Sequence, residues 1–259
     1  MIKFSIITIT YNAEKVFKKT LNSVLEQSYP YIEHIIVDGA STDKTLQIAN
    51  DYMQESYAAD NGHEIRIISE PDNGLYDAMN KGLKMAIGDY IVFMNAGDSF
   101  PKATTIEQIA NKIISIPKEQ LPAVLYGETD IVDENFKRIC PRRLKTPNHL
   151  SWQSFKNGML VCHQSFYARL DIARNIPYNL KYKYSADFDW CIRVMKEAEH
   201  LNLAMIDTNI ITTNYLKEGE TTRHHKESLR ERYEIMCNYY GKMPTLIRHI
   251  WFAIRSIIK

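Results

Sequence analysis

The chain has 259 residues, 45% of them hydrophobic and 24% charged, which are the proportions of an ordinary soluble globular protein able to bury a full core. Its 32 basic and 31 acidic residues give a formal net charge of +1, which excludes the global positive field of a nucleic-acid-binding protein. The four widely spaced cysteines include no CxxC pair, which excludes zinc-type spacing and is typical of reduced cytosolic thiols.

Apolar strands and amphipathic helices alternate through the first hundred residues. Apolar and β-branched runs predict strands at residues 4–10, 34–38, 65–69 and 90–94. The spacing of apolar residues predicts helices at residues 14–27 and 75–86. Between them, a further helix is expected to be capped by Ser41 or Thr42 and to run through Ile48. This alternation is typical of a parallel sheet with crossover helices, so the expected fold class is α/β.

Each predicted strand ends in polar residues with small neighbours. The four strand ends carry, in chain order, the pair Thr10 and Asn12, then Asp38, then Ser69, and finally the pair Asn95 and Asp98. Ligands of open α/β sheets bind outside the carboxyl ends of the strands, so four such ends in succession indicate a binding site. No GxGxxG follows the first strand, which disfavours a dinucleotide-dependent dehydrogenase, and no GxxxxGK[ST] is present, which excludes a P-loop.

The segment from Tyr90 to Asp98 is the most informative of these strand ends. An apolar run of strand length stops at a turn that carries Asn95, Gly97 and Asp98. A carboxylate at this point is well placed to hold a divalent metal on oxygen ligands and, through the metal, a diphosphate. An ordinary turn rich in Asn, Gly and Asp is the alternative.

Four blocks of the sequence, in their order and spacing, resemble family 2 glycosyltransferases of the GT-A fold. The blocks are residues 5–12 (SIITITYN), 37–45 (VDGASTDKT), 80–89 (NKGLKMAIGD) and 93–98 (FMNAGD). The resemblance implies a Rossmann-like, mostly parallel sheet with flanking helices and a helical C-terminal tail. The implied division is a GT-A domain at 1–225, with a nucleotide-binding half at 1–100 and an acceptor-binding half at 101–225, and a helical extension at 226–259.

The resemblance also implies an activity. Members of the family move a hexosyl or N-acetylhexosaminyl group from a nucleotide-diphosphate sugar, most commonly a UDP-sugar, to a hydroxyl group. For this chain we expect an inverting enzyme that acts on a glycan or lipid-linked acceptor in cell-surface polysaccharide biosynthesis, with Mn²⁺ or Mg²⁺ as cofactor.

On this resemblance, the nucleotide lies at the ends of the first two strands. Thr10 and Asn12 then line the nucleotide pocket, and Asp38 accepts a hydrogen bond from the base or the ribose. The alternative for Asp38 is an Asx turn that stabilises its own loop. Asn95 then hydrogen-bonds the ribose, and Asp77 contributes to the donor site or lies on a solvated helix face.

Asp98 is the implied metal ligand. The family motif commonly has acidic residues at its first, third and fourth positions, which here are Asn95, Gly97 and Asp98. One carboxylate therefore remains, and the diphosphate itself can supply further ligands. His224, or Arg223 beside it, lies where some relatives close a loop over the diphosphate, so the resemblance implies contact of His224 or Arg223 with the metal or a phosphate. A basic surface loop is the alternative.

The acidic block YSADFDW at residues 184–190 resembles the family segment that supplies the catalytic base. Asp187 aligns with the base, although Ala186 replaces the usual preceding Glu. A carboxylate within hydrogen-bond reach can deprotonate the acceptor hydroxyl while the diphosphate leaves from the opposite face. The alternative for Asp187 is stabilisation of a helix dipole. Asp189 must point to another helix face, so it is assigned a supporting role in the pocket.

Residues 158–167 (GMLVCHQSFY) resemble a strand on which relatives build part of the acceptor and donor-sugar pocket. Its polar members are His163 and Gln164, which are hydrogen-bonding groups inside an apolar segment. A satisfied core histidine is the alternative for His163.

The tail at residues 243–259 is apolar, with Arg248, Arg255 and Lys259 interspersed, and it is too short and too charged to span a bilayer. A basic amphipathic helix of this kind favours contact with a membrane surface, and packing on the domain or in a dimer interface is the alternative. Because the N-terminal apolar run is too short for a signal peptide, we expect a cytoplasmic protein, peripheral on the inner face of the cell membrane.

Two rival functions belong to other classes. Uncharged residues, namely Asn95, Gly97 and Ala186, stand where the family commonly has acidic ones. This loss of carboxylates is compatible with a non-catalytic nucleotide-sugar binding module. A nucleotidyltransferase is disfavoured, because the residues after the first strand do not form the Gly-rich, basic loop of that class.

Overall fold

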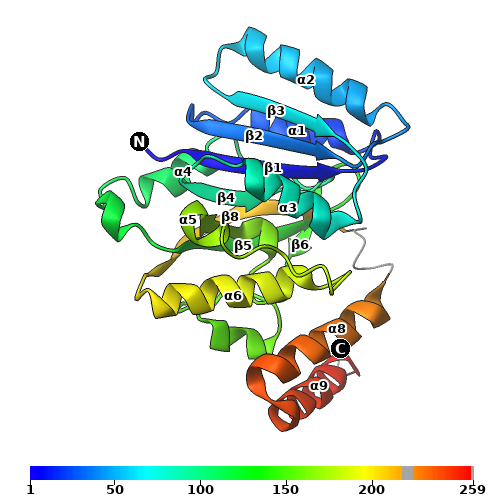
Figure 1. Cartoon of the computed structure of the whole chain (residues 1–259), viewed down its shortest axis with the longest axis vertical. Coiled ribbons are helices and arrows are strands. Elements are labelled where there is room, and N and C mark those ends of the chain that lie inside the picture. Colours follow the sequence, from blue (N-terminus) through cyan, green and yellow to red (C-terminus); the bar gives the residue numbers. More distant parts are fainter. Residues whose placement is uncertain (218–223, 258–259) are drawn as a thin grey trace.

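The computed structural model describes residues 1–217 and 224–257 (Figure 1). Its strands are β1 (Phe4–Thr10), β2 (Ile32–Asp38), β3 (Glu64–Ser69), β4 (Tyr90–Phe93), β5 (Val124–Val132), β6 (Arg138–Pro141), β7 (Phe166–Arg169) and β8 (Met205–Leu216). Its α-helices are α1 (Phe17–Leu25), α2 (Thr45–Ala59), α3 (Leu75–Met85), α4 (Thr105–Asn111), α5 (Leu170–Ala173), α6 (Ala186–His200), α8 (His225–Tyr240) and α9 (Lys242–Ile257). Short 3₁₀ helices are η1 (Lys118–Gln120), η2 (Trp152–Asn157) and η3 (His163–Ser165).

One mixed sheet organises the described part of the chain. Its strands run in the order β3-β2-β1-β4-β7-β5-β6, and β8 pairs with β5. The pairs β2–β3, β1–β2 and β1–β4 are parallel, whereas β7 is antiparallel to both β4 and β5. The α/β class and the four N-terminal strands predicted from the alternation are confirmed.

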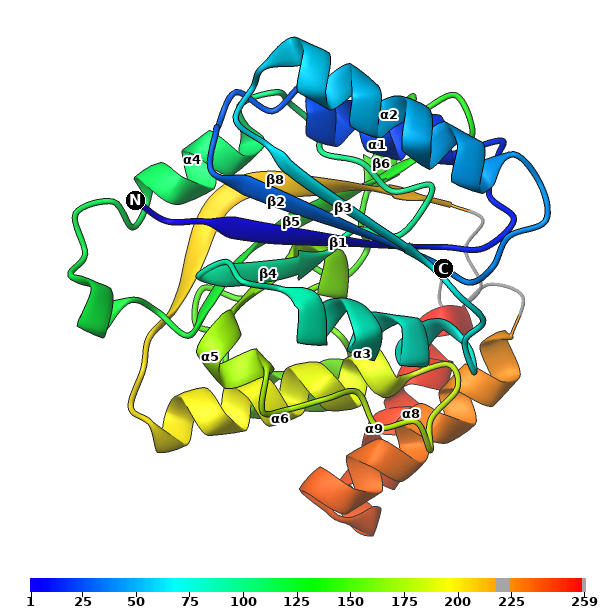
Figure 2. The same ribbon diagram turned by 45° about the horizontal axis from the view of Figure 1, so that its top comes forward.

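Helices cover both faces of this sheet. In Figure 2, α1, α2 and α4 lie on one side, and α3, α5 and α6 lie on the other. Strand β1 is buried on both faces because its side chains alternate between two cores: Phe4 and Ile6 pack on the α4 side, and Ile7 and Ile9 on the α3 side. Burial on both faces explains why the sequence of this strand is mostly apolar and β-branched and does not alternate between apolar and charged residues.

The predicted cap of the second helix is wrong. Helix α2 begins at Thr45 after Lys44, and no side chain of Lys44 caps it. The Asp43 Oδ1 atom instead accepts a hydrogen bond from the Thr45 backbone N–H at 2.9 Å. Ser41 and Thr42 lie before this position, and the Ser41 hydroxyl donates to the Asp38 carboxylate and accepts from the Asn12 backbone N–H at 2.8 Å instead of capping the helix.

The strand expected over residues 158–167 is shorter than predicted. Only Phe166 and Tyr167 of that segment belong to β7, and His163 and Gln164 lie in the preceding 3₁₀ helix η3. The turn is closed by a hydrogen bond from the Ser165 N–H to the Cys162 carbonyl at 2.9 Å. Apolar periodicity alone does not separate such a buried turn from a strand.

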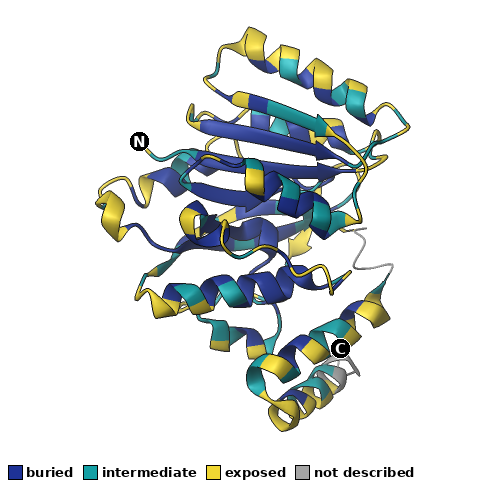
Figure 3. Cartoon of the chain, viewed as in Figure 1, coloured by how far each residue is buried: buried dark blue, intermediate teal, exposed yellow. Residues whose placement is uncertain are grey.

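The C-terminal helices α8 and α9 form a pair beneath α6 (Figure 1). Figure 3 shows that this pair is much less buried than the sheet. Helix α8 starts at His225, next to the predicted boundary at residue 225, and the division into domains stays a prediction.

A glycine sets the distance between α3 and the sheet. A Cβ atom at Gly82 would collide with the Cγ2 methyl group of Ile7 in β1. We expect Gly82→Ala to lower the free energy of unfolding by about 1 kcal/mol or more, because the cost of overpacking exceeds the gain in helix propensity. Lys84→Ala, on the exposed face of the same helix, should leave it unchanged or raise it slightly. Urea unfolding measures both, and a stabilised Gly82→Ala variant would show that α3 can move away from β1.

Candidate active site

Parallel pairing brings the ends of the N-terminal strands to one edge of the sheet. Thr10 at the end of β1 pairs with Asp38 at the end of β2, and Asp38 pairs with Ser69 at the end of β3. Beyond β4, the Ala96 N–H donates to the Ile9 carbonyl at 3.2 Å, which holds the turn that carries Asn95 and Asp98 beside them. The predicted strand-end residues therefore do gather along one edge.

Asp38 stabilises the loop that follows it. Its Oδ2 atom accepts hydrogen bonds from the Ser41 backbone N–H at 3.0 Å and from the Ser69 hydroxyl at 2.6 Å. Its Oδ1 atom accepts a hydrogen bond from the Ser41 hydroxyl. The two bonds from Ser41 stabilise the loop after Asp38, as the alternative predicts, but the backbone bond reaches three residues on and not the two of an Asx turn. Any ligand of this fully buried carboxylate must share oxygens that already have partners.

The two residues predicted at the end of the first strand differ in their bonding. Asn12 adopts a left-handed conformation with φ of 47°, and its Oδ1 accepts a hydrogen bond from the Thr42 N–H at 2.8 Å. Thr10 is buried, and its hydroxyl has no hydrogen-bond partner in the described structure. An unpartnered buried hydroxyl is costly, so Thr10 is the more available group for a ligand.

The hydrogen bonds of Asp77 in the described structure come from Asn73, just before its own helix. Asp77 lies in the first turn of α3, and its Oδ2 accepts from the backbone N–H of Asn73 at 3.0 Å and from the Asn73 side chain at 3.3 Å. A carboxylate in a first turn also interacts favourably with the helix dipole. Its role in donor binding stays a prediction.

Asp98 is held by two segments from the other half of the chain. Its Oδ2 accepts a hydrogen bond from Gln164 Nε2 at 2.8 Å, and its Oδ1 accepts one from the Leu216 N–H at 3.1 Å. The side chain is almost fully buried, with 4% of the residue exposed. Burial raises the pKa of Asp98 to about 6, although both hydrogen bonds and the nearby His163 act to lower it.

The donor atoms around Asp98 fit a hard divalent cation that takes part of its coordination from a ligand. Asn95 Oδ1 is buried and has no hydrogen-bond partner in the described structure, so it is an oxygen available next to the carboxylate. The described residues contain no cluster of three or more His, Cys, Asp or Glu side chains. Carboxylate and amide oxygens suit Mg²⁺ or Mn²⁺, and Mg²⁺ usually keeps waters and substrate phosphates as its other ligands.

A chain of hydrogen bonds connects this end of the site with Asp187. The Asn95 Nδ2 atom lies 3.3 Å from His163 Nε2, and His163 Nδ1 lies 3.2 Å from Asp187 Oδ2. The Tyr76 hydroxyl donates to Asp187 Oδ1 at 3.1 Å. Because the Asn95 amide nitrogen can only donate, Nε2 of His163 is the acceptor in this contact, and Nδ1–H donates to Asp187.

Asp187 is buried but remains acidic. Burial by itself raises the pKa of the Asp187 carboxyl, but the hydrogen bond from His163, the charge of Arg232 and the Phe188 N–H outweigh it. The net result is a pKa below the ordinary value, so the group is an ionised carboxylate at neutral pH. An ionised carboxylate in the first turn of α6 is the state that a general base requires.

Asp189 faces away from this chain, as the helix spacing predicts. Its Oδ2 accepts from Arg193 Nε at 2.7 Å, and its Oδ1 accepts from the Tyr239 hydroxyl at 2.8 Å. These contacts join α6 to α8. The arrangement favours a structural role for Asp189, beside the helix turn that carries Asp187.

His224 stacks on Tyr184, with ring centroids 4.6 Å apart. It precedes α8, and its contact with a metal stays a prediction. Arg223 lies outside the described residues.

Sequence reasoning missed Tyr76, Tyr239 and the backbone N–H of Leu216. Tyr76 lies on the buried stripe of α3 next to Asp77, and helical periodicity could have placed it toward the core. No sequence signal marks the other two, because they meet the acidic residues only through tertiary packing.

The sequence of the chain matches a known family. The family described as "Glycosyl transferase family 2" matches residues 5–174. The chain is 35% identical over 191 residues to the PGL/p-HBAD biosynthesis glycosyltransferase of Mycobacterium tuberculosis, which covers 73% of this chain and 68% of that protein.

Solved structures are similar in fold. S. aureus TarS 1–349 in complex with UDP-GlcNAc has a TM-score of 0.69 at 21% identity, covering 96% of this chain and 73% of that chain. The mannosyltransferase PcManGT from Pyrobaculum calidifontis in complex with GDP-Man and Mn²⁺ has a TM-score of 0.57 at 16% identity, covering 98% and 75%. The predicted GT-A fold is confirmed.

The buried Asp98 should destabilise the metal-free protein at neutral pH. The pKa of this carboxyl rises from 3.8 to about 6 on folding, so the folded state binds the proton more tightly than the unfolded state does. The resulting contribution to stability is fully present below pH about 4 and is lost as the pH rises through 6. In EDTA, Asp98→Asn should therefore match the parent near pH 4 and exceed its free energy of unfolding by about 2 kcal/mol at pH 8.

Urea unfolding across this pH range measures the difference. Asp51→Asn, which neutralises an exposed carboxylate on α2, is the control and should show no such trend. A difference between Asp98→Asn and the parent that stays constant with pH would contradict the raised pKa.

Proposed function

Because this chain belongs to glycosyl transferase family 2, we propose that it is an inverting glycosyltransferase with a nucleotide-diphosphate sugar donor. The proposed donor is a UDP-sugar, and the proposed acceptor is a hydroxyl of a glycan or lipid-linked intermediate in cell-surface polysaccharide biosynthesis. The transferred group is a hexosyl or N-acetylhexosaminyl unit, in keeping with the UDP-GlcNAc bound by the similar TarS structure. The observation that supports the proposal best is the hydrogen-bonded chain from Asn95, beside Asp98, through His163 to Asp187.

Asp98 and Asn95 are the groups proposed to hold a divalent cation at the donor end. Gln164 and the Leu216 N–H fix the orientation of the Asp98 carboxylate, and Asn95 Oδ1 has no competing partner in the described structure. A bound Mn²⁺ or Mg²⁺ would neutralise charge that develops on the leaving diphosphate. The complex of the similar PcManGT with GDP-Man and Mn²⁺ supports this assignment.

Asp187 is the proposed general base at the acceptor end. The acceptor hydroxyl oxygen forms a bond to the anomeric carbon, its proton passes to Asp187, and the bond from that carbon to the diphosphate oxygen breaks with its electron pair. Tyr76 and His163 hold the two carboxylate oxygens, so the base is positioned before the acceptor arrives. Attack opposite the leaving group inverts the anomeric configuration.

Release of nucleoside diphosphate tests this function. Across a panel of nucleotide sugars with Mn²⁺, we expect slow hydrolysis of one donor that EDTA and Asp98→Ala abolish. With an acceptor present, Asp187→Asn should reduce kcat by a factor of about 10² to 10⁴, because general-base catalysis is lost, while the Kd for the nucleotide stays within about threefold. The exposed Asp51→Asn variant is the matched control and should behave as the parent.

A non-catalytic binding module is the rival reading of the same site. It predicts nucleotide affinity without release of nucleoside diphosphate, and no effect of Asp187→Asn. Absence of both binding and release across the panel would overturn the glycosyltransferase proposal for this chain.

We further propose that α9 touches the surface of an anionic membrane. No described helix has the length and apolarity needed to cross a bilayer. Helix α9 exposes apolar side chains at helical spacing, namely Met243, Ile247, Ile250, Trp251 and Ile254. Its sequence contains Lys242, Arg248 and Arg255 and no acidic residue, so an anionic lipid surface complements it.

Cosedimentation with vesicles measures this contact. The protein should sediment with phosphatidylglycerol vesicles and much less with phosphatidylcholine vesicles. Ile247→Glu should reduce sedimentation several-fold because it places a negative charge on the apolar face, whereas Ile114→Glu, at a 72% exposed site after α4, should not. Equal sedimentation of the two variants would point to α9 packing against protein instead.

A further inference from the structure

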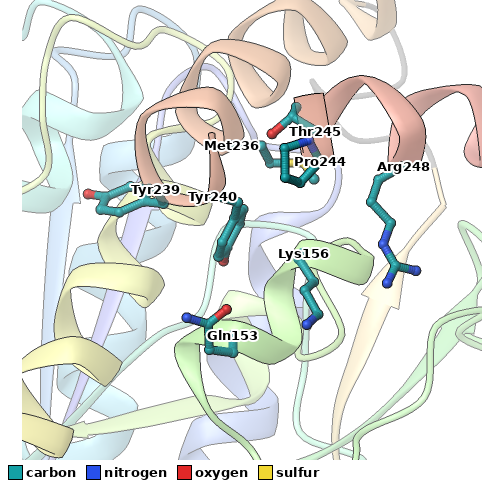
Figure 4. Close-up of a pocket in the computed structure, with 8 residues that line it drawn as sticks. All are labelled: Gln153, Lys156, Met236, Tyr239, Tyr240, Pro244, Thr245 and Arg248. Atoms are coloured by element: carbon teal, nitrogen blue, oxygen red, sulfur yellow. The ribbon is translucent and has the colours of Figure 1, made fainter. Parts of the chain in front are cut away.

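A pocket outside the site described above opens between η2 and the α8–α9 pair (Figure 4). Its volume is about 350 Å³, within the range of small-ligand sites. The lining residues are Gln153 and Lys156 from η2, Met236, Tyr239 and Tyr240 from α8, and Pro244, Thr245 and Arg248 from α9.

The charges of this pocket are all positive. Lys156 and Arg248 contribute from opposite elements, as Figure 4 shows, and no carboxylate lines the pocket. Neither cation forms an ion pair or hydrogen bond with the residues that the structure describes. The pocket therefore suits an anionic ligand.

An unsatisfied hydroxyl adds to this preference. Thr245 is fully buried, and its Oγ1 has no hydrogen-bond partner in the described structure. A buried hydroxyl without a hydrogen bond is unfavourable, and a ligand oxygen in the pocket would supply the missing partner. Two cations and one hydroxyl donor are the groups that bind phosphate oxygens. The walls formed by Met236 and Pro244 are apolar, which suits a phosphate attached to an apolar body.

The position of the pocket indicates where that apolar body lies. Arg248 follows Ile247, and Ile247 and Trp251 belong to the exposed apolar face of α9. An occupant with its phosphate at Arg248 can therefore lay a hydrocarbon chain along that face. On its inner side, the Tyr239 hydroxyl that contacts Asp189 ties the pocket wall to the first turn of α6, which carries Asp187.

We infer that this pocket binds the phosphate or diphosphate group of a lipid-borne sugar acceptor. Lys156, Arg248 and Thr245 contact the phosphate oxygens, and the lipid chain lies on the apolar face of α9. The assignment of the lipid as the acceptor rests on the proposed function, whereas the recognition of a lipid diphosphate does not.

Isothermal titration calorimetry with farnesyl diphosphate tests the inference. The probe is used below its critical micelle concentration, with inorganic diphosphate and farnesol as comparison ligands. We expect farnesyl diphosphate to bind at least tenfold more tightly than either, because it alone carries both parts. Lys156→Gln and Arg248→Gln should each weaken it about tenfold or more. Arg230→Gln removes an exposed cation of α8 outside the pocket and is the matched control.

The other outcomes overturn the inference. Equal affinity for inorganic and farnesyl diphosphate would mean a site for free anions, and affinity unaffected by Lys156→Gln and Arg248→Gln would place the lipid elsewhere. No binding of farnesyl diphosphate would also reject it. A parallel titration with UDP separates this result from the proposed function, because the strand-end site binds UDP whether or not the pocket is occupied.

Discussion

The buried Asp98 carboxylate is the contact on which the arrangement of the site depends. Its two oxygens join the turn after β4 to Gln164 in η3 and to Leu216 at the end of β8. Removal from water makes the ionised form costly, as the raised pKa shows. A chain selected only for stability would not place a single carboxylate there. The proposed cation would compensate this charge, and functional sites commonly sacrifice stability in this way.

The chain of hydrogen bonds through His163 has a different effect on Asp187. Donors surround that carboxylate, so it stays acidic despite burial, whereas Asp98 lacks enough of them. Two buried carboxylates in one site therefore have opposite pKa shifts, which suits one to cation binding and the other to proton transfer. His163 contacts Asn95 on one side and Asp187 on the other, so one imidazole ring links the two ends of the site.

Much of the N-terminal half could be predicted because its signals are local. Buried strands show as apolar runs, and parallel pairing necessarily gathers their polar ends, so the edge that holds Thr10, Asp38 and Asn95 follows from the pattern. The errors arose where tertiary contacts decide the structure. Ser41 looks like a helix cap but is recruited by Asp38, and His163 sits in a turn that apolar periodicity does not distinguish from a strand. The fold and family were predicted correctly, whereas the roles of the individual site residues stay predictions.

The topology of the sheet also bears on the order in which the protein folds. Strands β1 to β4 pair among themselves, so they can assemble as soon as the first hundred residues are available. Strand β8 pairs with β5, far earlier in the chain, and the bond from Leu216 to Asp98 closes a loop of 118 residues. Contacts that close such long loops form slowly, because the chain loses much conformational entropy before they are made. The surroundings of Asp98 are therefore completed only when β8 docks, and a nascent chain that ends before residue 216 carries Asp98 without the backbone donor that orients it.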